Sequence, residues 1–437
     1  MKRNTYILTL MLLLMTLVVK AQKTVPISKA DVLNRVSKEN LSIKISEQEF
    51  VQARADYRQT NAVFLPNITA SHTGIATTNP LMAFGSKLNQ EILTQNDFNP
   101  NLLNNPSQIE NYATKIEIQQ PLINVDGIYQ RKAARSKMEA MSLQTQRTTD
   151  YLMFEVDKAY MQLQLAYKGV EVLELALKTA NENKKIADNS FKQGYLQRAD
   201  VLSVEVRLTE IKNQLQTAKS NIENASNYLS FLMNTNSDVI LQPIDSLTVS
   251  NVNLYANKSI TENRSDIKAM HLALDAYESM NKADKMAFLP RLNAFGSYEL
   301  YDDQIFQGDA NGYLFGAQLS WNIFEGSKRF GKAQKSKAEF DKSKLEYDQY
   351  VSQSNLELHK AKRMLTDTEN KLNLTQLALK QSKESLRIRT NRFKEGLEKT
   401  SDLLIAETQY AQKQLEYYQT IFEYNYAQAY LNFLTKE

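Results

Sequence analysis

A short motif occurs twice in this chain, 202 residues apart, and each copy interrupts a long helical pattern. The copies at 191–202 and 393–404 both read Phe-Lys-x-Gly, with an aspartate six residues after the glycine and then an apolar pair. Gly194 and Gly396 suit the position just beyond a helix end, where a residue with left-handed backbone closes the last turn. One copy alone would indicate an ordinary turn, whereas the matched pair predicts two long helical hairpins with equivalent tips.

The residues after each glycine predict where the next helix begins. Asp200 in the first copy, and Ser401 beside Asp402 in the second, are residue types whose side-chain oxygen caps a helix N-terminus. We therefore expect these residues at the N-caps of the helices that leave the two tips.

The helices on both sides of the first tip have the apolar spacing of a coiled coil. Residues 126–193 contain no proline and only two glycines, and a 4-3 repeat of apolar and small residues resumes after the tip and continues to residue 232. On the entering helix the repeat comprises Leu152, Val156, Ala159, Leu163, Ala166, Val170, Leu173, Leu177 and Ala180. A helix of about 70 residues is about 100 Å long, so each tip is expected to end a very long helix.

The rest of the chain is duplicated as well. Phe-Leu-Pro occurs at 64–66 and again at 288–290, each time between a predicted helix and a predicted strand. The expected helices lie at 24–59 (opened by a capping-box pattern at 28–31), 126–193, 201–232, 260–286, 326–395 and from the second tip to 434. The expected strands lie at 67–78, 114–119, 291–301 and 312–323, with a long polar loop at 79–112. The predicted organisation is a signal peptide at 1–21, a first repeat at 22–236, a connector at 237–259 and a second repeat at 260–437.

The N-terminus predicts export. Lys2 and Arg3 precede an apolar run that ends in Val-Lys-Ala, a small-residue cleavage site typical of secretory signal peptides. Cleavage after Ala21 would leave 50 Lys and Arg against 49 Asp and Glu, a balance that argues against nucleic acid as a partner. The absence of cysteine excludes disulfides, thiol catalysis, cysteine metal sites and a lipidated N-terminal cysteine.

The strands of the second repeat alternate between apolar and polar residues over about ten positions, with aromatic residues near their ends. This alternation is typical of membrane β-barrel strands, although any half-buried sheet also shows it. Four strands are too few to close a barrel with a lumen, and open strand edges are not tolerated in lipid. The strands are therefore expected to pair with those of other copies, so that three chains supply twelve.

In order, spacing and duplication the chain resembles the TolC-type outer membrane efflux proteins (outer membrane factors). The residues that carry the resemblance are 64–66, Gln120-Pro121-Leu122, 191–202, 288–290, 321–326 and 393–404. The resemblance implies a mainly helical fold with a membrane β portion: a homotrimer in which a 12-stranded β-barrel continues into an α-barrel of coiled-coil hairpins. It also implies localisation in the outer membrane with a long periplasmic extension, contact with lipid there, and no cofactor.

For function, the resemblance implies the channel of a tripartite efflux or secretion system. The tips would meet a periplasmic membrane-fusion (adaptor) protein and an inner-membrane pump of the RND or ABC type. The channel would be a passive conduit for small molecules such as drugs and toxic compounds, or for proteins, and would perform no catalysis.

The resemblance also suggests gate residues at the tips, where hydrogen bonds and ion pairs between neighbouring hairpins constrict the family's channel. The acidic positions carry over to Asp200 and Asp402. Phe393 stands where the best-studied gate has a tyrosine, and because phenylalanine has no hydroxyl, the gate hydrogen bond of that tyrosine cannot form here. Glu398 stands where that gate has an arginine.

We hypothesise that the gate cation comes from the first repeat. Arg198, taken as the counterpart of Glu398, would then pair with Asp402 or Glu398. The alternative is that Arg198, Glu398 and Lys399 are solvated charges, which are common at exposed turns.

Two other classes of function are alternatives to a channel. A periplasmic coiled-coil scaffold outside the membrane would also have long helices, and trimer formation and dependence on detergent distinguish it from a channel. An enzyme is disfavoured because the three histidines, His72, His271 and His359, show no metal-site spacing.

Overall fold

The computed structural model describes residues 23–236, 239–250 and 259–437. The predicted signal peptide lies outside the described residues, as do residues 237–238 and 251–258 of the predicted connector.

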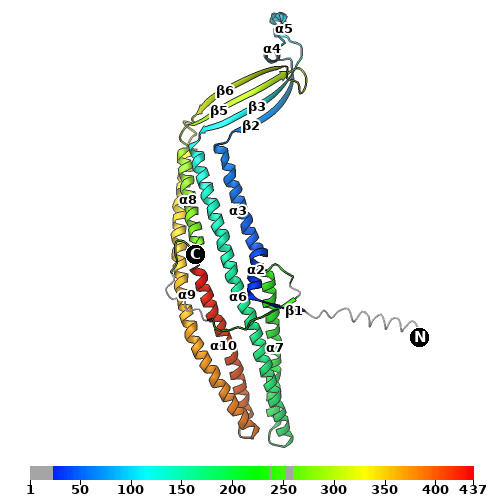
Figure 1. The fold of residues 1–437 in the computed structure, drawn as a ribbon, viewed down its shortest axis with the longest axis vertical. Coiled ribbons are helices and arrows are strands. Elements are labelled where there is room, and N and C mark those ends of the chain that lie inside the picture. The colour runs from blue at the N-terminus through cyan, green and yellow to red at the C-terminus, as the bar shows by residue number, and fades with distance from the viewer. Residues whose placement is uncertain (1–22, 237–238, 251–258) are drawn as a thin grey trace, which may run out of the picture. The chain divides into compact units, whose positions relative to one another are not determined.

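Two very long helices organise the chain, as predicted (Figure 1). Helix α6 (Val125–Lys192) has 68 residues and helix α9 (Lys328–Lys394) has 67. Each turns at a tip into a helix of 35 residues, α7 (Arg198–Leu232) or α10 (Thr400–Leu434). The predicted seam of α6 is largely confirmed, since Val156, Ala159 and Leu163 are fully buried.

The chain divides into two compact units that do not follow the two sequence repeats. One unit contains the described residues of 23–47, 144–267 and 350–437, and the other contains 48–143 and 268–349. Each repeat contributes to both units, because α6 and α9 begin in one unit and end in the other.

The predicted helix at 24–59 is wrong in two places. Its first residues form strand β1 (Lys23–Ile27), and the remainder is split into α2 (Lys29–Glu39) and α3 (Leu41–Gln59), followed by the 3₁₀ turn η1 (Thr60–Val63). The break falls at Asn40, whose side-chain oxygen accepts hydrogen bonds from the N–H groups of Ser42 and Ile43. The capping box that opens α2 is confirmed, with Ser28 at the N-cap.

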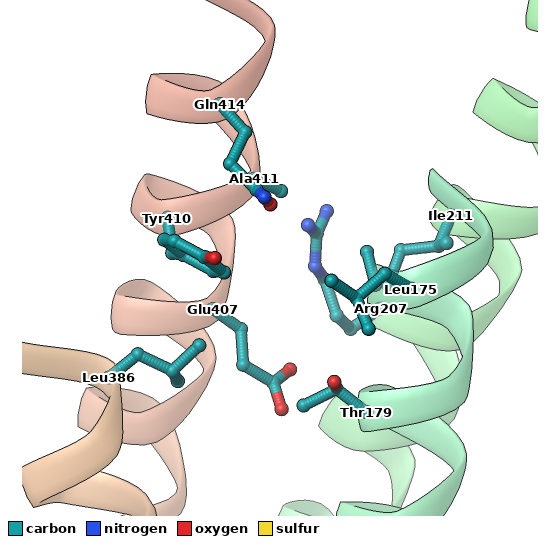
Figure 2. Close-up of a pocket in the computed structure, with 10 residues that line it drawn as sticks. Leu175, Thr179, Arg207, Ile211, Leu386, Glu407, Tyr410, Ala411 and Gln414 are labelled. Atoms are coloured by element: carbon teal, nitrogen blue, oxygen red, sulfur yellow. The ribbon is translucent and has the colours of Figure 1, made fainter. Parts of the chain in front are cut away.

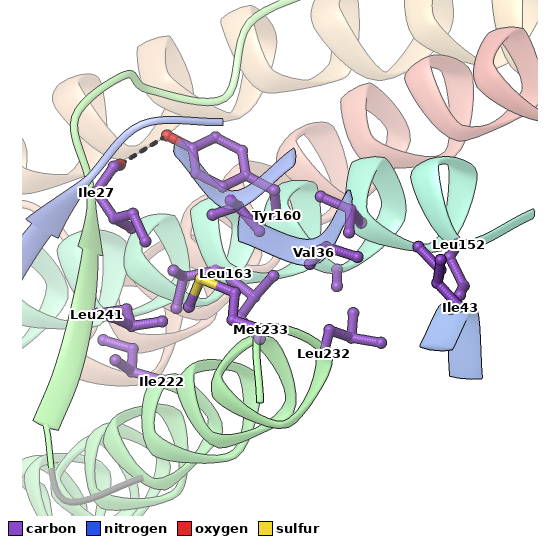
Figure 3. Packing of buried hydrophobic residues seen from close by; sticks show 14 residues of the cluster. Ile27, Val36, Ile43, Leu152, Tyr160, Leu163, Ile222, Leu232, Met233 and Leu241 are labelled. Atoms are coloured by element: carbon purple, nitrogen blue, oxygen red, sulfur yellow. Dashed lines mark hydrogen bonds between the residues drawn. The ribbon is translucent and has the colours of Figure 1, made fainter. Parts of the chain in front are cut away.

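Strand β1 pairs in parallel with β4 (Val239–Pro243), a strand that the sequence analysis had assigned to the connector. This two-stranded sheet packs on α6 and helps to bury the largest apolar cluster, to which α2 and α7 also contribute (Figure 3). The Tyr160 hydroxyl donates to the Ile27 carbonyl at 3.2 Å, and that of Tyr167 donates to the Leu241 carbonyl at 3.1 Å. Both hydroxyls come from α6, so the long helix holds both strands.

The second sheet is antiparallel, in the order β2-β3-β5-β6. Its strands are β2 (Asn67–Thr77), β3 (Ile109–Ile123), β5 (Arg291–Asp302) and β6 (Ala310–Ser320). The register places Ile116 opposite Tyr298 and Tyr298 opposite Tyr313, so these apolar side chains share one face. The other face is polar, because Lys115 forms ion pairs with Glu117 at 2.9 Å and Glu299 at 3.4 Å.

The predicted polar loop at 79–112 contains regular structure instead. Helix α4 (Pro80–Asn89), the 3₁₀ turn η2 (Gln95–Phe98) and helix α5 (Pro100–Asn104) occupy it, and β3 begins at Ile109, before the predicted 114. Asn79 and Asn99 cap the two α-helices, each followed by a proline in the first turn. The remaining helix, α8 (Ser265–Met286), begins later than predicted. Across the described ranges, no helix is both long and apolar enough to traverse a lipid bilayer.

Candidate functional site at the hairpin tips

The two tips have the same backbone geometry, as the repeated motif predicts. Gly194 has a φ of +80° and Gly396 a φ of +70°, the left-handed conformation that favours glycine. At the first tip the N–H of Gly194 donates to the Phe191 carbonyl at 3.0 Å, and the N–H of Tyr195 donates to the Ser190 carbonyl at 2.8 Å. The second tip repeats both bonds, at 3.1 and 2.8 Å, so each long helix ends in a Schellman motif.

The predicted N-caps after the tips are wrong by three residues or fewer. Helix α7 begins at Arg198 with Gln197 at its N-cap, and α10 begins at Thr400 with Lys399 at its N-cap. Asp200 therefore lies in the first turn, where its carboxylate accepts a hydrogen bond from the Gln197 N–H at 3.1 Å. Asp402 has the same place in α10, and a carboxylate in a first turn is favourable because the helix dipole is positive there.

Phe393 packs where the two hairpins meet. It is 5 % exposed and packs with Ala187 of α6, Val204 of α7 and Leu403 of α10, so this cluster takes one buried side chain from each of four helices. Its counterpart in the first repeat, Phe191, is 40 % exposed. The repeated motif therefore has one aromatic that joins the hairpins and one that does not.

Glu398 is held by arginines of its own hairpin. Arg389 contacts one carboxylate oxygen at 2.7 Å and Arg392 contacts the other at 2.8 Å. Asp402 has a longer contact with Arg389, at 3.8 Å. The sequence analysis missed both arginines, although they precede the tip on α9 at a spacing that places them near it.

Arg198 is exposed, and among the described residues no ion pair joins it to Asp402 or Glu398. Its assignment as the counterpart of Glu398 is also corrected. When the tips are aligned on their glycines, Arg198 corresponds to Thr400, and Glu398 corresponds to Leu196. The hypothesis that Arg198 supplies the gate cation stays a prediction about contacts between chains.

A small cavity lies between the hairpins, lined by residues of all four helices, and Glu407 of α10 and Arg207 of α7 both reach into it (Figure 2). Glu407 is 6 % exposed and accepts a hydrogen bond from the Asn183 side chain of α6. Its second oxygen and the Arg207 Nε have no hydrogen-bond partner in the described part of the chain. The sequence did hold a signal for this site. Glu407 lies four residues after Leu403 and three before Tyr410, so a charged residue occupies a position of the 4-3 spacing that is normally apolar.

Burial raises the pKa of Glu407 above the usual 4.5, while the Asn183 amide and the charge of Arg207 act in the opposite direction. A raised folded-state pKa means that folding favours the protonated form. The contribution of Glu407 to the stability of the folded protein is therefore complete below pH 4.5 and is lost as the pH rises through the folded pKa of this carboxyl.

Replacing Glu407 by glutamine is expected to stabilise the protein at neutral and alkaline pH by about 1–3 kcal/mol, since the buried charge is removed while the amide contact can remain. The measurement is the thermal unfolding midpoint of the detergent-solubilised protein across pH 4–8, and the two proteins should converge at the acidic end. The matched control is Glu205→Gln, because this equivalent residue is more exposed and contacts Lys184 at 3.5 Å. An equal gain in both variants would contradict the explanation.

A model of a protein family described as "outer membrane efflux protein" matches residues 32–235 and 257–435. These two segments cover most of both sequence repeats.

Solved outer-membrane channels have the same fold. The CmeC outer membrane channel of Campylobacter jejuni is 17% identical, with a TM-score of 0.82 over 93% of this chain and 85% of that one. The outer membrane protein VceC of Vibrio cholerae is 16% identical, with a TM-score of 0.79 over 93% and 95%. The MtrE channel of Neisseria gonorrhoeae, in its open state, is 16% identical with a TM-score of 0.75 over 93% and 88%.

Among curated proteins, the extracellular matrix-binding protein EbhB of Staphylococcus aureus is 23% identical over 292 residues. The match spans 63% of this chain but only 4% of that much longer protein. A likeness of this extent assigns no family.

Proposed function

The chain belongs to the outer membrane efflux protein family, and on this premise we propose that it is the outer-membrane channel of a tripartite export system. In this proposal three copies form a passive conduit for small molecules or proteins, and no step of the export is catalysed by the chain itself. The observation that carries the proposal is the four-stranded sheet, which has one exposed apolar face and two open edges.

The open edges support a trimer. In the described residues β2 and β6 each pair on one side only, and backbone groups at such edges need partners in lipid. Pairing β6 of one copy with β2 of the next would satisfy both edges, and three copies would close twelve strands around a polar interior. The apolar face, which includes Ile68, Tyr313 and Phe315, would then meet lipid.

The tips support a docking role towards a periplasmic adaptor. Tyr195 and Leu397 occupy the same position after the two tip glycines, and they are 80 % and 66 % exposed. Large apolar side chains exposed at equivalent places in both hairpins favour a protein partner that meets the two tips in the same way. We propose an adaptor protein linked to an inner-membrane pump as that partner.

The proposal is tested by purifying the chain from the outer membrane of a Gram-negative host in detergent. We expect a trimer by native mass spectrometry and ion conductance when it is added to planar lipid bilayers. A water-soluble monomer without conductance would overturn the proposal and favour the periplasmic scaffold instead.

Arg198→Ala is expected to raise the conductance of the resting channel, if Arg198 pairs with a neighbouring chain. Asp402 is the better candidate partner, because Glu398 is already held by two arginines and Asp402 has only the longer contact. An exposed ion pair contributes about 0–1 kcal/mol, so three copies would change the open probability by up to roughly a hundredfold. Single-channel recording measures this effect, with Lys399→Ala as the control at an exposed tip cation. Unchanged conductance would show that Arg198 is a solvated charge.

A further inference from the structure

The apolar face of the sheet continues past the end of β6. Phe315 and Leu319 lie on this face, and Trp321 and Ile323 follow at the same alternation. All four are exposed, as is Phe324, with Ile323 at 80 % and Phe324 at 81 %. The indole N–H of Trp321 donates to the Phe288 carbonyl at 2.9 Å, so a hydrogen bond to the backbone holds this ring.

Positive charge gathers beside this apolar segment, where the strands meet the helices. The ten residues next to each strand on the helix side (57–66, 124–133, 281–290 and 321–330) hold seven Lys or Arg and three Asp or Glu. The segment that links β5 and β6 at the opposite end of the strands shows no such excess, since 303–309 holds two aspartates and no cation.

The three acids of this region are already neutralised by the chain itself. Asp126 pairs with Arg291 at 2.5 Å, Asp284 with Lys332 at 2.8 Å, and Glu325 with Arg329 at 3.4 Å. Four cations remain exposed and have no ion pair within the described residues: Arg58, Lys132, Lys285 and Lys328.

We propose that this junction surface, formed by Trp321, Ile323 and Phe324 with these four cations, binds phospholipids that carry anionic headgroups. Trp321 and Ile323 continue the alternation of the lipid-facing side of the sheet and, together with the neighbouring Phe324, would contact acyl chains. The cations would lie at the depth of the headgroup phosphates, where each Lys or Arg contributes about a fivefold preference for an anionic surface. An aromatic residue with a polar N–H is favoured at such an interface. This inference rests on the proposed insertion of the sheet in the membrane.

Trp321 is the one tryptophan in the sequence, so its fluorescence reports on this surface alone. The trimer is reconstituted in phosphatidylcholine vesicles that contain, at equal mole fraction, either brominated phosphatidylglycerol or brominated phosphatidylcholine as the quencher. We expect the brominated phosphatidylglycerol to quench Trp321 several-fold more strongly, and the difference to shrink as salt is raised.

The test variant carries Arg58→Gln, Lys132→Gln, Lys285→Gln and Lys328→Gln, and should be quenched equally by both lipids. The matched control removes the same charge from exposed helix positions elsewhere, with Lys178→Gln, Lys219→Gln, Lys360→Gln and Lys383→Gln. It should keep the wild-type preference.

Four outcomes would overturn the inference. The first is equal quenching of the wild type by the two brominated lipids, and the second is an unchanged preference for brominated phosphatidylglycerol in the test variant. The third is loss of this preference when inorganic phosphate replaces chloride at equal ionic strength. The fourth is protection of Trp321 from every quencher by a neighbouring copy. The first two would leave the proposed channel intact if conductance in phosphatidylcholine persists. Quenching by aqueous iodide but by neither lipid, together with absent conductance, would overturn the proposed function as well.

Discussion

Phe393→Ala is expected to loosen the two hairpins at their tips and to raise the resting conductance of the channel. Phe393 is buried where α6, α7, α9 and α10 each contribute one buried side chain, so its removal leaves a cavity at the contact between the hairpins. Truncating a buried phenylalanine costs about 3–5 kcal/mol in well-packed cores. A loss of this size at the tips would favour arrangements in which the hairpins separate.

The internal repeat supplies the control for this experiment. Phe191 has the same place before the first tip glycine, but it is outside the cluster, so Phe191→Ala should change stability by less than about 0.5 kcal/mol. Phe393→Leu, which keeps most of the apolar volume, should lie between the wild type and Phe393→Ala. The measurements are the thermal midpoint in detergent and single-channel conductance. Equal effects at positions 393 and 191 would show that the cluster does not hold the hairpins together.

Asp266→Ala is expected to destabilise the protein by about 3–5 kcal/mol, because it leaves the buried Arg264 and the partly buried Arg147 without their counter-charge. Arg264 donates two hydrogen bonds to the Asp266 carboxylate, at 2.6 and 2.9 Å, and Tyr350 donates a third at 2.6 Å. Arg147 approaches the same carboxylate at 3.3 Å. These groups come from the start of α8 and from α6 and α9, so a single carboxylate joins three parts of the fold.

The same network holds the end of α10. Arg264 donates to the Leu434 carbonyl at 3.1 Å and Arg147 to the Phe433 carbonyl at 3.1 Å, with the Arg147 guanidinium 3.8 Å from the centre of the Phe433 ring. These contacts occupy carbonyls at a helix C-terminus, which have no partner within the helix. Loss of Asp266 is therefore expected to release the last turn of α10 first.

The pH dependence of this network follows from the pKa of Asp266. Burial acts to raise the pKa, but the hydrogen bonds from Arg264 and Tyr350 outweigh it and hold the pKa below the usual 3.8. A depressed pKa gives stabilisation that is present above pH 3.8 and is lost as the pH falls through the folded value. Asp266→Asn should remove this acid sensitivity at a smaller loss of stability than Asp266→Ala. Asp31→Ala, at an exposed capping box, is the control, and a loss there as large as that at Asp266 would contradict the explanation.

Local patterns were enough to predict the helices, the tips and most of the strands. The lengths of α6 and α9 follow from an apolar repeat without proline, and the positive φ of Gly194 and Gly396 follows from the one residue type that adopts it without strain. The errors also had local causes. The N-cap after each tip was assigned to the aspartate, because a carboxylate is favourable both at the N-cap and at the third residue of a helix. At the third residue it accepts from the N-cap N–H, as Asp200 does from Gln197.

Contacts between residues distant in sequence could be learned only from the folded chain. β1 pairs with β4 across more than 200 residues. The five residues of Lys23–Ile27 are too few to show an alternation that predicts a strand. The residues around Phe393 and Phe191 in the motif do not predict which of the two is buried, because Phe393 is buried by side chains of the other hairpin. Helix periodicity depends on residues that are neighbours along the chain. The hydrogen bond between Asn183 and Glu407 depends instead on how four helices pack, and that packing is decided by all of their side chains together.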